Sequence, residues 1–195
     1  PQTAADDFAG FALEYPSDSY ATGNVTGYTA GGFVGYDDDY GFYTNDHASG
    51  NVQGVVSGGY SYAGGFLGYG SSTWELSNVY ATGNVSGGST VAGDTYAGGL
   101  AGYVDTDEGI VNSHATGSVV GAYYAGGLVG DSDSDIADSY ATGNVNGATG
   151  GDIGGLVGYN DSTITGSYAT GNVKGVLGTD SYVGGLVGDN NDTID

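Results

Sequence analysis

The side chains with the clearest chemical potential are carboxylates that recur in short turns. Asp131, Asp133 and Asp135 alternate with serines, which sets oxygen ligands at every second position as calcium sites do. The pattern is not an EF-hand, because Ile136 stands where that loop needs glycine and Thr142 where it needs glutamate. The candidate Ca²⁺ ligands are Asp131, Asp133, Asp135, Asp105 and Asp107. The plainer interpretation, which we favour, is a solvated acidic turn.

Catalytic chemistry has less support. His47 and His114 stand where other copies of the same phrase carry tyrosine, and the chain has no cysteine. Metal and triad sites need convergent partners, so we interpret both histidines as rings that substitute in an aromatic row. Parallel β-helices also host polysaccharide lyases and hydrolases, but a lyase needs a cation beside the uronate, and Lys174 is the only Lys or Arg. We therefore expect no enzyme activity and no required cofactor, with Ca²⁺ or high salt as the supporting ions.

These residues are positioned by a repeat. The phrase Ser-Tyr-Ala-Thr-Gly-Asn-Val and its close variants occupy residues 19–25, 46–52, 79–85, 113–119, 139–145 and 167–173. A second phrase, small-Gly-Gly-(Leu/Phe)-small-Gly, follows each copy at 30–35, 63–68, 97–102, 125–130, 153–158 and 183–188. A unit of 26–34 residues cannot bury its own apolar residues, so it must stack on its neighbours.

Each unit holds three β-compatible stretches bounded by turn residues, around Ile164, Tyr168–Val173 and Leu186 in the last full copy. Helices are disfavoured because 42 residues are glycine. We predict an all-β, right-handed parallel β-solenoid of about six coils, each with three short strands and a rise of about 4.8 Å. Residues 1–18 are predicted to form a partial coil or junction. Residues 19–195 are predicted to form six repeats that end in the start of another coil.

Alternation within the first phrase sets two faces. Ala169 and Val173 point one way and Tyr168, Thr170 and Asn172 the other. We favour the small residues inside, although stacked tyrosines inside remain an open alternative. The asparagines of successive coils are expected to hydrogen-bond amide to amide, as asparagine ladders do in cross-β stacks.

The outer rows are the candidate binding face for a glycan, another cell or ice. Its members are Tyr20, Tyr80, Tyr140, Tyr168, Thr22, Thr82, Thr142 and Thr170. The plainer interpretation, which we favour, is that aromatic and threonine rows only stabilise the stack.

The second phrase reads Gly-Leu-Val-Gly at 127–130, 155–158 and 185–188, and it resembles the GLUG motif. The resemblance covers nearly all of residues 19–195, with Phe33 and Phe66 in place of leucine in the first two copies. It implies a repeat region of large secreted or surface-attached prokaryotic proteins, often adhesin-like. The family supplies no catalytic residues to transfer.

Charge restricts the partners and the setting. The chain has 23 acidic residues against one lysine, for a net charge of −22. This excludes nucleic-acid binding and docking on anionic lipid. It fits a halophilic setting or one rich in divalent cations, where self-repulsion is screened. No stretch is long enough to span a membrane, and no signal peptide opens the chain, so we expect an extracellular or cell-surface protein whose signal peptide is already removed.

We therefore predict a non-enzymatic extracellular structural protein that assembles with copies of itself, head to tail, into a fibre or stalk. Open solenoid ends present unpaired strand edges, and Phe11, Leu13 and Ile194 are the candidate end residues. The alternative is an adhesin segment that binds glycan or another surface, and a polysaccharide-processing enzyme is the least favoured. Four sequons, at Asn24, Asn84, Asn160 and Asn191, make a glycoprotein possible in principle, and the last two are favoured because we expect them in turns.

Overall fold

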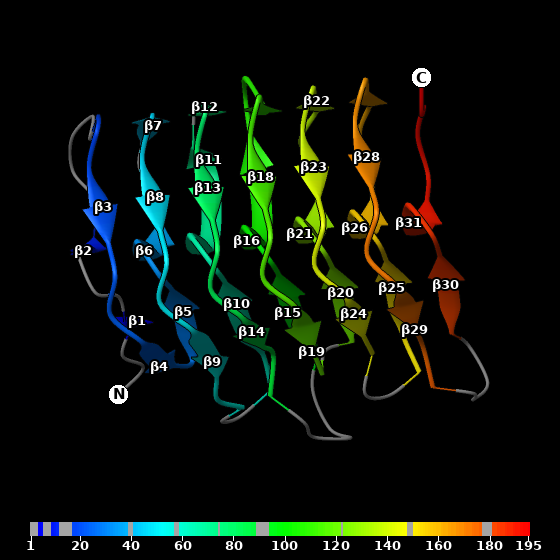
Figure 1. Ribbon diagram of the computed structural model, residues 1–195, viewed down its shortest axis with the longest axis horizontal. Helices are drawn as coiled ribbons and strands as arrows, with labels where there is room; N and C mark the ends of the chain where they lie inside the picture. Colours follow the sequence, from blue (N-terminus) through cyan, green and yellow to red (C-terminus); the bar gives the residue numbers. More distant parts are fainter. Residues whose placement is uncertain are drawn as a thin grey trace.

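The computed structural model describes residues 4–5, 9–11, 17–38, 41–56, 59–73, 75–88, 94–121, 123–147, 150–176 and 181–195. These residues form 31 short strands and no helix, and accordingly no helix in the described ranges could cross a membrane. The strands build a row of coils along the long axis, with the N-terminus and the C-terminus at opposite ends (Figure 1). The predicted all-β solenoid is confirmed.

Five parallel sheets, named A to E in chain order around a coil, make up its walls. Sheet A contains β1 (Ala4–Ala5), β5 (Thr29–Gly31), β10 (Ser61–Gly64), β15 (Thr95–Gly98), β20 (Tyr124–Gly126), β25 (Asp152–Gly154) and β30 (Tyr182–Gly184). Sheet B contains β2 (Ala9–Phe11), β6 (Val34–Asp37), β11 (Leu67–Thr73), β16 (Ala101–Thr106), β21 (Val129–Ser132), β26 (Val157–Asn160) and β31 (Val187–Asn190).

The other three sheets complete the coil. Sheet C contains β7 (Phe42–Thr44), β12 (Glu75–Ser77), β17 (Ile110–Val111), β22 (Ile136–Ala137) and β27 (Ile164–Thr165). Sheet D contains β3 (Tyr20–Ala21), β8 (His47–Ala48), β13 (Tyr80–Ala81), β18 (His114–Ala115), β23 (Tyr140–Ala141) and β28 (Tyr168–Ala169). Sheet E contains β4 (Val25–Gly27), β9 (Val52–Gly54), β14 (Val85–Ser86), β19 (Val119–Val120), β24 (Val145–Asn146) and β29 (Val173–Lys174).

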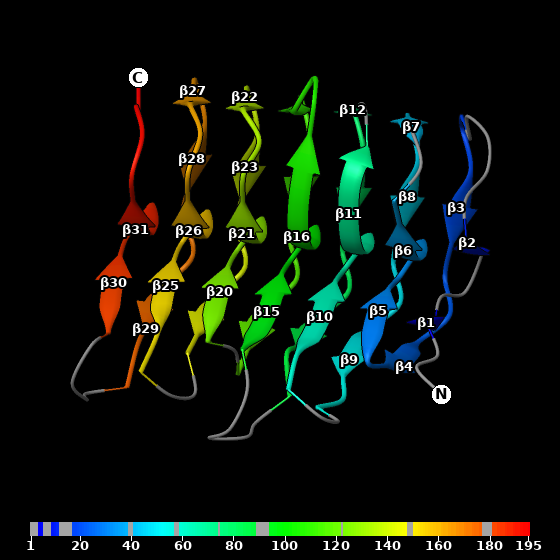
Figure 2. The same ribbon diagram turned by 180° about the vertical axis from the view of Figure 1, so that it is seen from behind.

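The winding is right-handed, as predicted. In Figure 1 the chain runs down the near side through β8 and β9, and Figure 2 shows it rising on the opposite side through β10 and β11. Each turn advances the chain by one coil towards the C-terminal end. The resulting right-handed winding is the one that connections between parallel strands almost always have. Repeat-equivalent residues stand in register, so that His114 pairs with Tyr80 on one side and Tyr140 on the other.

Each full coil has five strands, and the prediction of three is wrong. The stretch Tyr168–Val173 bends at its Thr-Gly-Asn centre, which sends one half to sheet D and the other to sheet E. The stretch around Leu186 likewise divides into β30 and β31. Glycine at both bends permits these corners, which a smooth strand does not contain. The described strands make about five complete turns between partial ones, close to the six predicted.

The core is apolar and continuous along the axis. One cluster joins the inward residues of sheets B, C and D, and a second joins the valines of sheet E to the small residues of sheet A. Ala81, Ala141 and Val145 of the first phrase are completely buried, whereas Thr82 and Thr142 are exposed. The predicted inward face of small residues is therefore confirmed, and the alternative with the first-phrase tyrosines inside is wrong.

The corner between sheets C and D repeats a left-handed backbone conformation. The residue two places before each ring of sheet D is Asp18, Asn45, Asn78, Asn112, Asp138 or Gly166, with φ between 49° and 60°. Asparagine, aspartate and glycine tolerate this region better than other residues do. The choice of residue at this position therefore places each corner at the same point of the coil.

Glycine is required where one coil lies directly on the next. A Cβ atom built on Gly83 would lie 1.8 Å from the carbonyl oxygen of Gly50 in the preceding coil. Any larger residue would separate the two coils, so the glycine of the Thr-Gly-Asn phrase holds the stacking distance.

Candidate functional site

An unbroken row of six rings runs along the outer surface of sheet D. Its members are Tyr20, His47, Tyr80, His114, Tyr140 and Tyr168, with neighbouring ring centroids 4.6 to 5.4 Å apart and planes within 16° of parallel. The interpretation of both histidines as substitutes in an aromatic row is confirmed. Burial lowers the pKa of His114, which favours its neutral ring. Ring faces inside the row contact each other, so only edges and hydroxyls remain for a ligand.

Threonines and asparagines follow the rings on the same outer side. Thr22, Thr82, Thr142 and Thr170 are all exposed, as predicted for the candidate face. The asparagine row is also exposed, but its bonding differs from the prediction. Asn24 Oδ1 accepts the backbone N–H of Asn51 at 2.8 Å, and Asn51 Oδ1 accepts that of Asn84 at 2.9 Å.

The expected amide-to-amide ladder is thus a side-chain-to-backbone ladder. The chain bends just before sheet E, and each side-chain oxygen there satisfies an N–H of the next coil. An amide-to-amide bond is present only as an addition, from Asn172 Nδ2 to Asn144 Oδ1 at 3.2 Å.

A second aromatic surface lies where sheets A and B meet, and the sequence analysis missed it. Tyr62, Tyr96 and Tyr124 stack along sheet A, while Tyr36, Tyr69 and Tyr103 stack along sheet B. The two rows touch edge to face, as at Tyr62 and Tyr69, whose centroids are 5.0 Å apart. In the sequence, this surface is indicated by two tyrosines that lie seven residues apart and flank the second phrase, as Tyr96 and Tyr103 do. We call this surface the A–B tyrosine face.

Carboxylates replace tyrosines at the C-terminal half of the A–B tyrosine face. Asp131 stands in register between Tyr103 and Tyr159, and Asp152 stands beside Tyr124. Burial, with the charges of other carboxylates nearby, raises the pKa of Asp131 to about 7. Burial and the charge of Asp189 raise the pKa of Asp152 to about 6. Asp131 Oδ1 is buried and accepts no hydrogen bond in the described part of the chain.

The five candidate calcium ligands are not gathered at one point. Asp133 accepts a hydrogen bond of 2.8 Å from the Tyr103 hydroxyl, and Asp135 accepts one of 2.6 Å from the Ser162 hydroxyl. That bond, with the N–H of Thr163, lowers the pKa of Asp135. Within the described ranges no three acidic, His or Cys side chains converge as a metal site requires. Calcium binding therefore stays a prediction for experiment.

The neighbouring turn contains the other two candidate calcium ligands. Asp105 and Asp107 are both exposed. Burial and the charge of Asp133 raise the pKa of Asp105. The negative charges of these neighbouring carboxylates therefore repel one another.

The sequons fall in unequal environments. Asn160 lies in β26 with its side chain completely buried, and its Nδ2 donates to Asn190 Oδ1 at 2.8 Å. The prediction of Asn160 as a glycan acceptor is therefore wrong for the folded chain, because the turn expected there begins one residue later. Asn191 is exposed and donates to the Tyr159 hydroxyl at 2.7 Å. Asn24 and Asn84 are exposed but belong to the ladder before sheet E.

The candidate end residues are only partly described. Leu13 lies outside the described residues, and Phe11 is described only as backbone in β2, where it pairs with Tyr36. Ile194 forms a parallel bridge with Ile164, which confirms that it starts a further rung of sheet C. It is 43% exposed, whereas Ile164 one coil earlier is 1% exposed.

Comparison with protein families agrees with this geometry. The family model of the GLUG motif matches residues 93–120, 121–146 and 149–174. The chain carries GLUG repeats. Each matched GLUG segment corresponds to one coil that passes through sheets A, B, C, D and E in turn, from β15 to β19 in the first case. The described strands that precede residue 93 share this register, from β5 and β10 to β9 and β14, so the same structural unit extends beyond the matched segments. No curated protein and no solved structure matches the chain.

Proposed function

We propose that this GLUG-repeat chain is a non-enzymatic structural segment of an extracellular fibre or stalk. The observation that carries the proposal is the unbroken register from coil to coil, in which each rung, including the one formed by β30, β31 and Ile194, presents a strand edge on which a further rung can stack. Val183 in β30 is 49% exposed, whereas Ile153, its partner in β25, is completely buried. An interior position of the solenoid thus becomes buried only when another rung stacks on it, and the strand edge offers backbone groups to that rung.

A second copy of the chain supplies the covering rung in this proposal. Head-to-tail contacts that do not close into a ring produce filaments. The aromatic, asparagine and glycine rows are identical in kind from coil to coil, so a junction between copies repeats the contacts inside one copy. Regular coils without a broken repeat suit a spacer better than an active site, which is the basis for proposing no catalysis.

Two copies of the chain can stack without a gap only if the strands at the junction rearrange. Sheets A and B contain seven rungs, because β1 and β2 add to one end and β30 and β31 to the other, whereas sheets D and E contain six. Two copies stacked with β1 on β30 would leave one rung of sheets D and E empty. We infer that β1 and β2 leave sheets A and B at a junction, so that β3 of the incoming copy stacks on β28.

The test is the assembly state of the purified chain at high NaCl, by sedimentation and negative-stain electron microscopy. Rods that lengthen with concentration are expected. Val183→Asp should prevent lengthening because it sets a charge on the covered rung. Val176→Asp, which adds the same charge at an exposed position after sheet E, should not. Rods of one fixed length at every concentration would refute end-to-end association.

The cell-surface setting is part of the same proposal. It is supported by the match to GLUG repeats and by a net charge of −22, which high salt screens. The adhesin alternative receives less support from the sheet D row, because the faces of its rings are already stacked on one another.

A further inference from the structure

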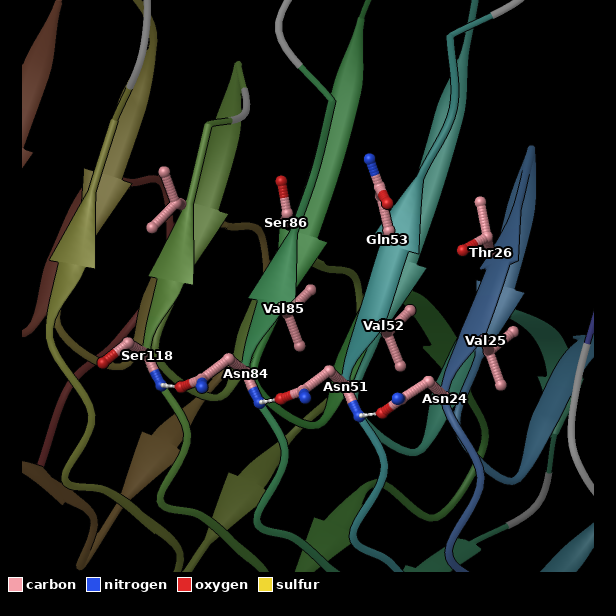
Figure 3. Close-up of a pocket in the computed structure, with 11 residues that line it drawn as sticks. Asn24, Val25, Thr26, Asn51, Val52, Gln53, Asn84, Val85, Ser86 and Ser118 are labelled. Atoms are coloured by element: carbon pink, nitrogen blue, oxygen red, sulfur yellow. Dashed lines mark hydrogen bonds between the residues drawn. The ribbon is translucent and has the colours of Figure 1, made fainter.

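A groove runs along the outer surface of sheet E, over β4, β9, β14 and β19. It has a volume of about 630 Å³ and crosses four coils. Figure 3 shows its side chains in two rows that run from coil to coil along the axis. The lining residues are Asn24, Val25, Thr26, Asn51, Val52, Gln53, Asn84, Val85, Ser86, Ser118 and Val120. The groove lies apart from the ring row of sheet D and from the A–B tyrosine face.

The lining is polar and uncharged. One row consists of Asn24, Asn51, Asn84 and Ser118. The strand register gives the other row, which consists of Thr26, Gln53, Ser86 and Val120. Valines of sheet E lie between the two rows in the sequence, but their side chains are almost completely buried and pack in the core against sheet A. All eleven residues are neutral in a chain with a net charge of −22. A polyanion has no cation to meet here and is repelled by the rest of the molecule.

The amides of the first row are held in one orientation. The backbone N–H of the next coil binds each side-chain Oδ1, at 2.8 Å for Asn24 and 2.9 Å for Asn51 and Asn84. Only the oxygen can accept this bond, so the contact fixes which end of each amide is the donor. The Nδ2 groups of three successive coils therefore form a regular set of exposed donors (Figure 3). Preorganised donors bind with less loss of side-chain entropy.

The spacing of the row selects the ligand. Donors recur at the distance between coils, about 4.8 Å. An extended peptide repeats its side-chain direction every two residues, or about 6.7 Å, so its side chains lose register with the donors within a few coils. An extended β-1,4-linked glucan advances by one sugar ring over a distance close to the coil spacing. Successive rings alternate in orientation, but every ring places hydroxyls that both donate and accept on each edge of the chain.

We propose that the sheet E groove binds a neutral, extended β-linked polysaccharide that lies along the solenoid axis. Sugar hydroxyls accept from the asparagine Nδ2 groups and donate to the side-chain oxygens of Thr26, Gln53 and Ser86. The C–H faces of the rings lie over the backbone of sheet E between the two rows. A stalk with this groove would adhere along its side wall, independently of its ends.

The test measures binding of soluble β-1,4-glucan oligosaccharides and of insoluble cellulose, with a polyuronate as the charged contrast. The variant is Asn51→Asp with Asn84→Asp. It keeps an oxygen for each backbone N–H and removes two of the three asparagine donors of the groove. The control is Asn144→Asp with Asn172→Asp, which makes the same change in the same row of sheet E outside the groove. Circular dichroism checks that all variants are folded.

Binding of the neutral glucans, weakened roughly tenfold or more in the groove variant and unchanged in the control, would support the proposal. Absence of neutral-glucan binding by the folded wild-type chain would overturn it. Equal loss in both variants would also overturn it, because added charge rather than the groove would then explain the effect. Binding of the polyuronate as strong as that of the neutral glucans would also overturn the proposal. Measurement in the Val183→Asp background separates this result from the outcome for fibre assembly.

Discussion

Replacement of Asp131 by asparagine should stabilise the folded chain at neutral and alkaline pH. Asp131 is partly buried on the A–B tyrosine face, and one of its oxygens is buried without a hydrogen-bond partner in the described residues. Its pKa is raised from 3.8 to about 7 by burial and by neighbouring carboxylates. The folded state therefore binds a proton more tightly than the unfolded state does.

The sign and size of the effect follow from linkage. With a raised folded-state pKa, stability is fully present below about pH 4 and is lost as the pH rises towards 7. A rise of about three pKa units corresponds to at most about 4 kcal/mol of unfolding free energy at pH 8. Salt and coupling to the other carboxylates reduce this, so we expect about 1–3 kcal/mol from Asp131→Asn at pH 8 and little at pH 4.

The assay is urea unfolding at fixed NaCl and several pH values between 4 and 8. The wild-type chain should lose stability across this range, and Asp131→Asn should show a shallower slope. Asp107→Asn is the matched control, since it removes the same charge at an exposed site. If the wild type and Asp131→Asn have parallel pH profiles, the reasoning from burial is refuted.

Four further outcomes are expected. Gly83→Ala should lower the free energy of unfolding by more than about 3 kcal/mol or prevent folding, because its Cβ would lie 1.8 Å from a carbonyl oxygen. Gly185→Ala should have a small effect, because nothing lies within 4 Å of a Cβ there. Thermal melting compares the two variants. At Asn112, with φ of 50°, alanine should lower the unfolding free energy by about 1 kcal/mol and glycine should not, as measured by urea unfolding. Removal of residues 1–16 should strengthen end-to-end association in sedimentation, since it removes β1 and β2 from the junction; weaker association would contradict the stacking scheme. Dialysis to low NaCl should lower the melting temperature because the charge of −22 is no longer screened, and a further fall with chelator at constant high NaCl would be the sign of bound Ca²⁺.

Periodicity predicted most of the architecture because every coil meets the same neighbours. Ala141 and Val145 alternate with Tyr140, Thr142 and Asn144, and that pattern gave the correct inner face. The row of rings followed from the same register, including the role of the histidines. Ile194 was identified as the start of a further rung from its spacing alone, and the structure confirms its bridge to Ile164.

Spacing could not reveal which stretches bend. The structure has five strands per coil where three were predicted, because glycine permits a corner without requiring one. The A–B tyrosine face was missed because contact between Tyr62 and Tyr69 depends on the angle between two sheets. Spacing also could not show that Asp133 and Asp135 each accept a hydrogen bond from a different hydroxyl, of Tyr103 and of Ser162.

The sequence by itself determined that this is a parallel stack of β-coils with repeat-equivalent residues in register, because strict repetition leaves each side chain its own copies as neighbours. Only the tertiary structure decided what the outer surface offers. Asn51 belongs to a row of asparagines that the repeat predicts. The direction in which its amide N–H groups point depends on the backbone N–H of the next coil, which binds its side-chain oxygen. Asp131 is one of 23 acidic residues in the sequence, and its raised pKa arises from the side chains that surround it in space.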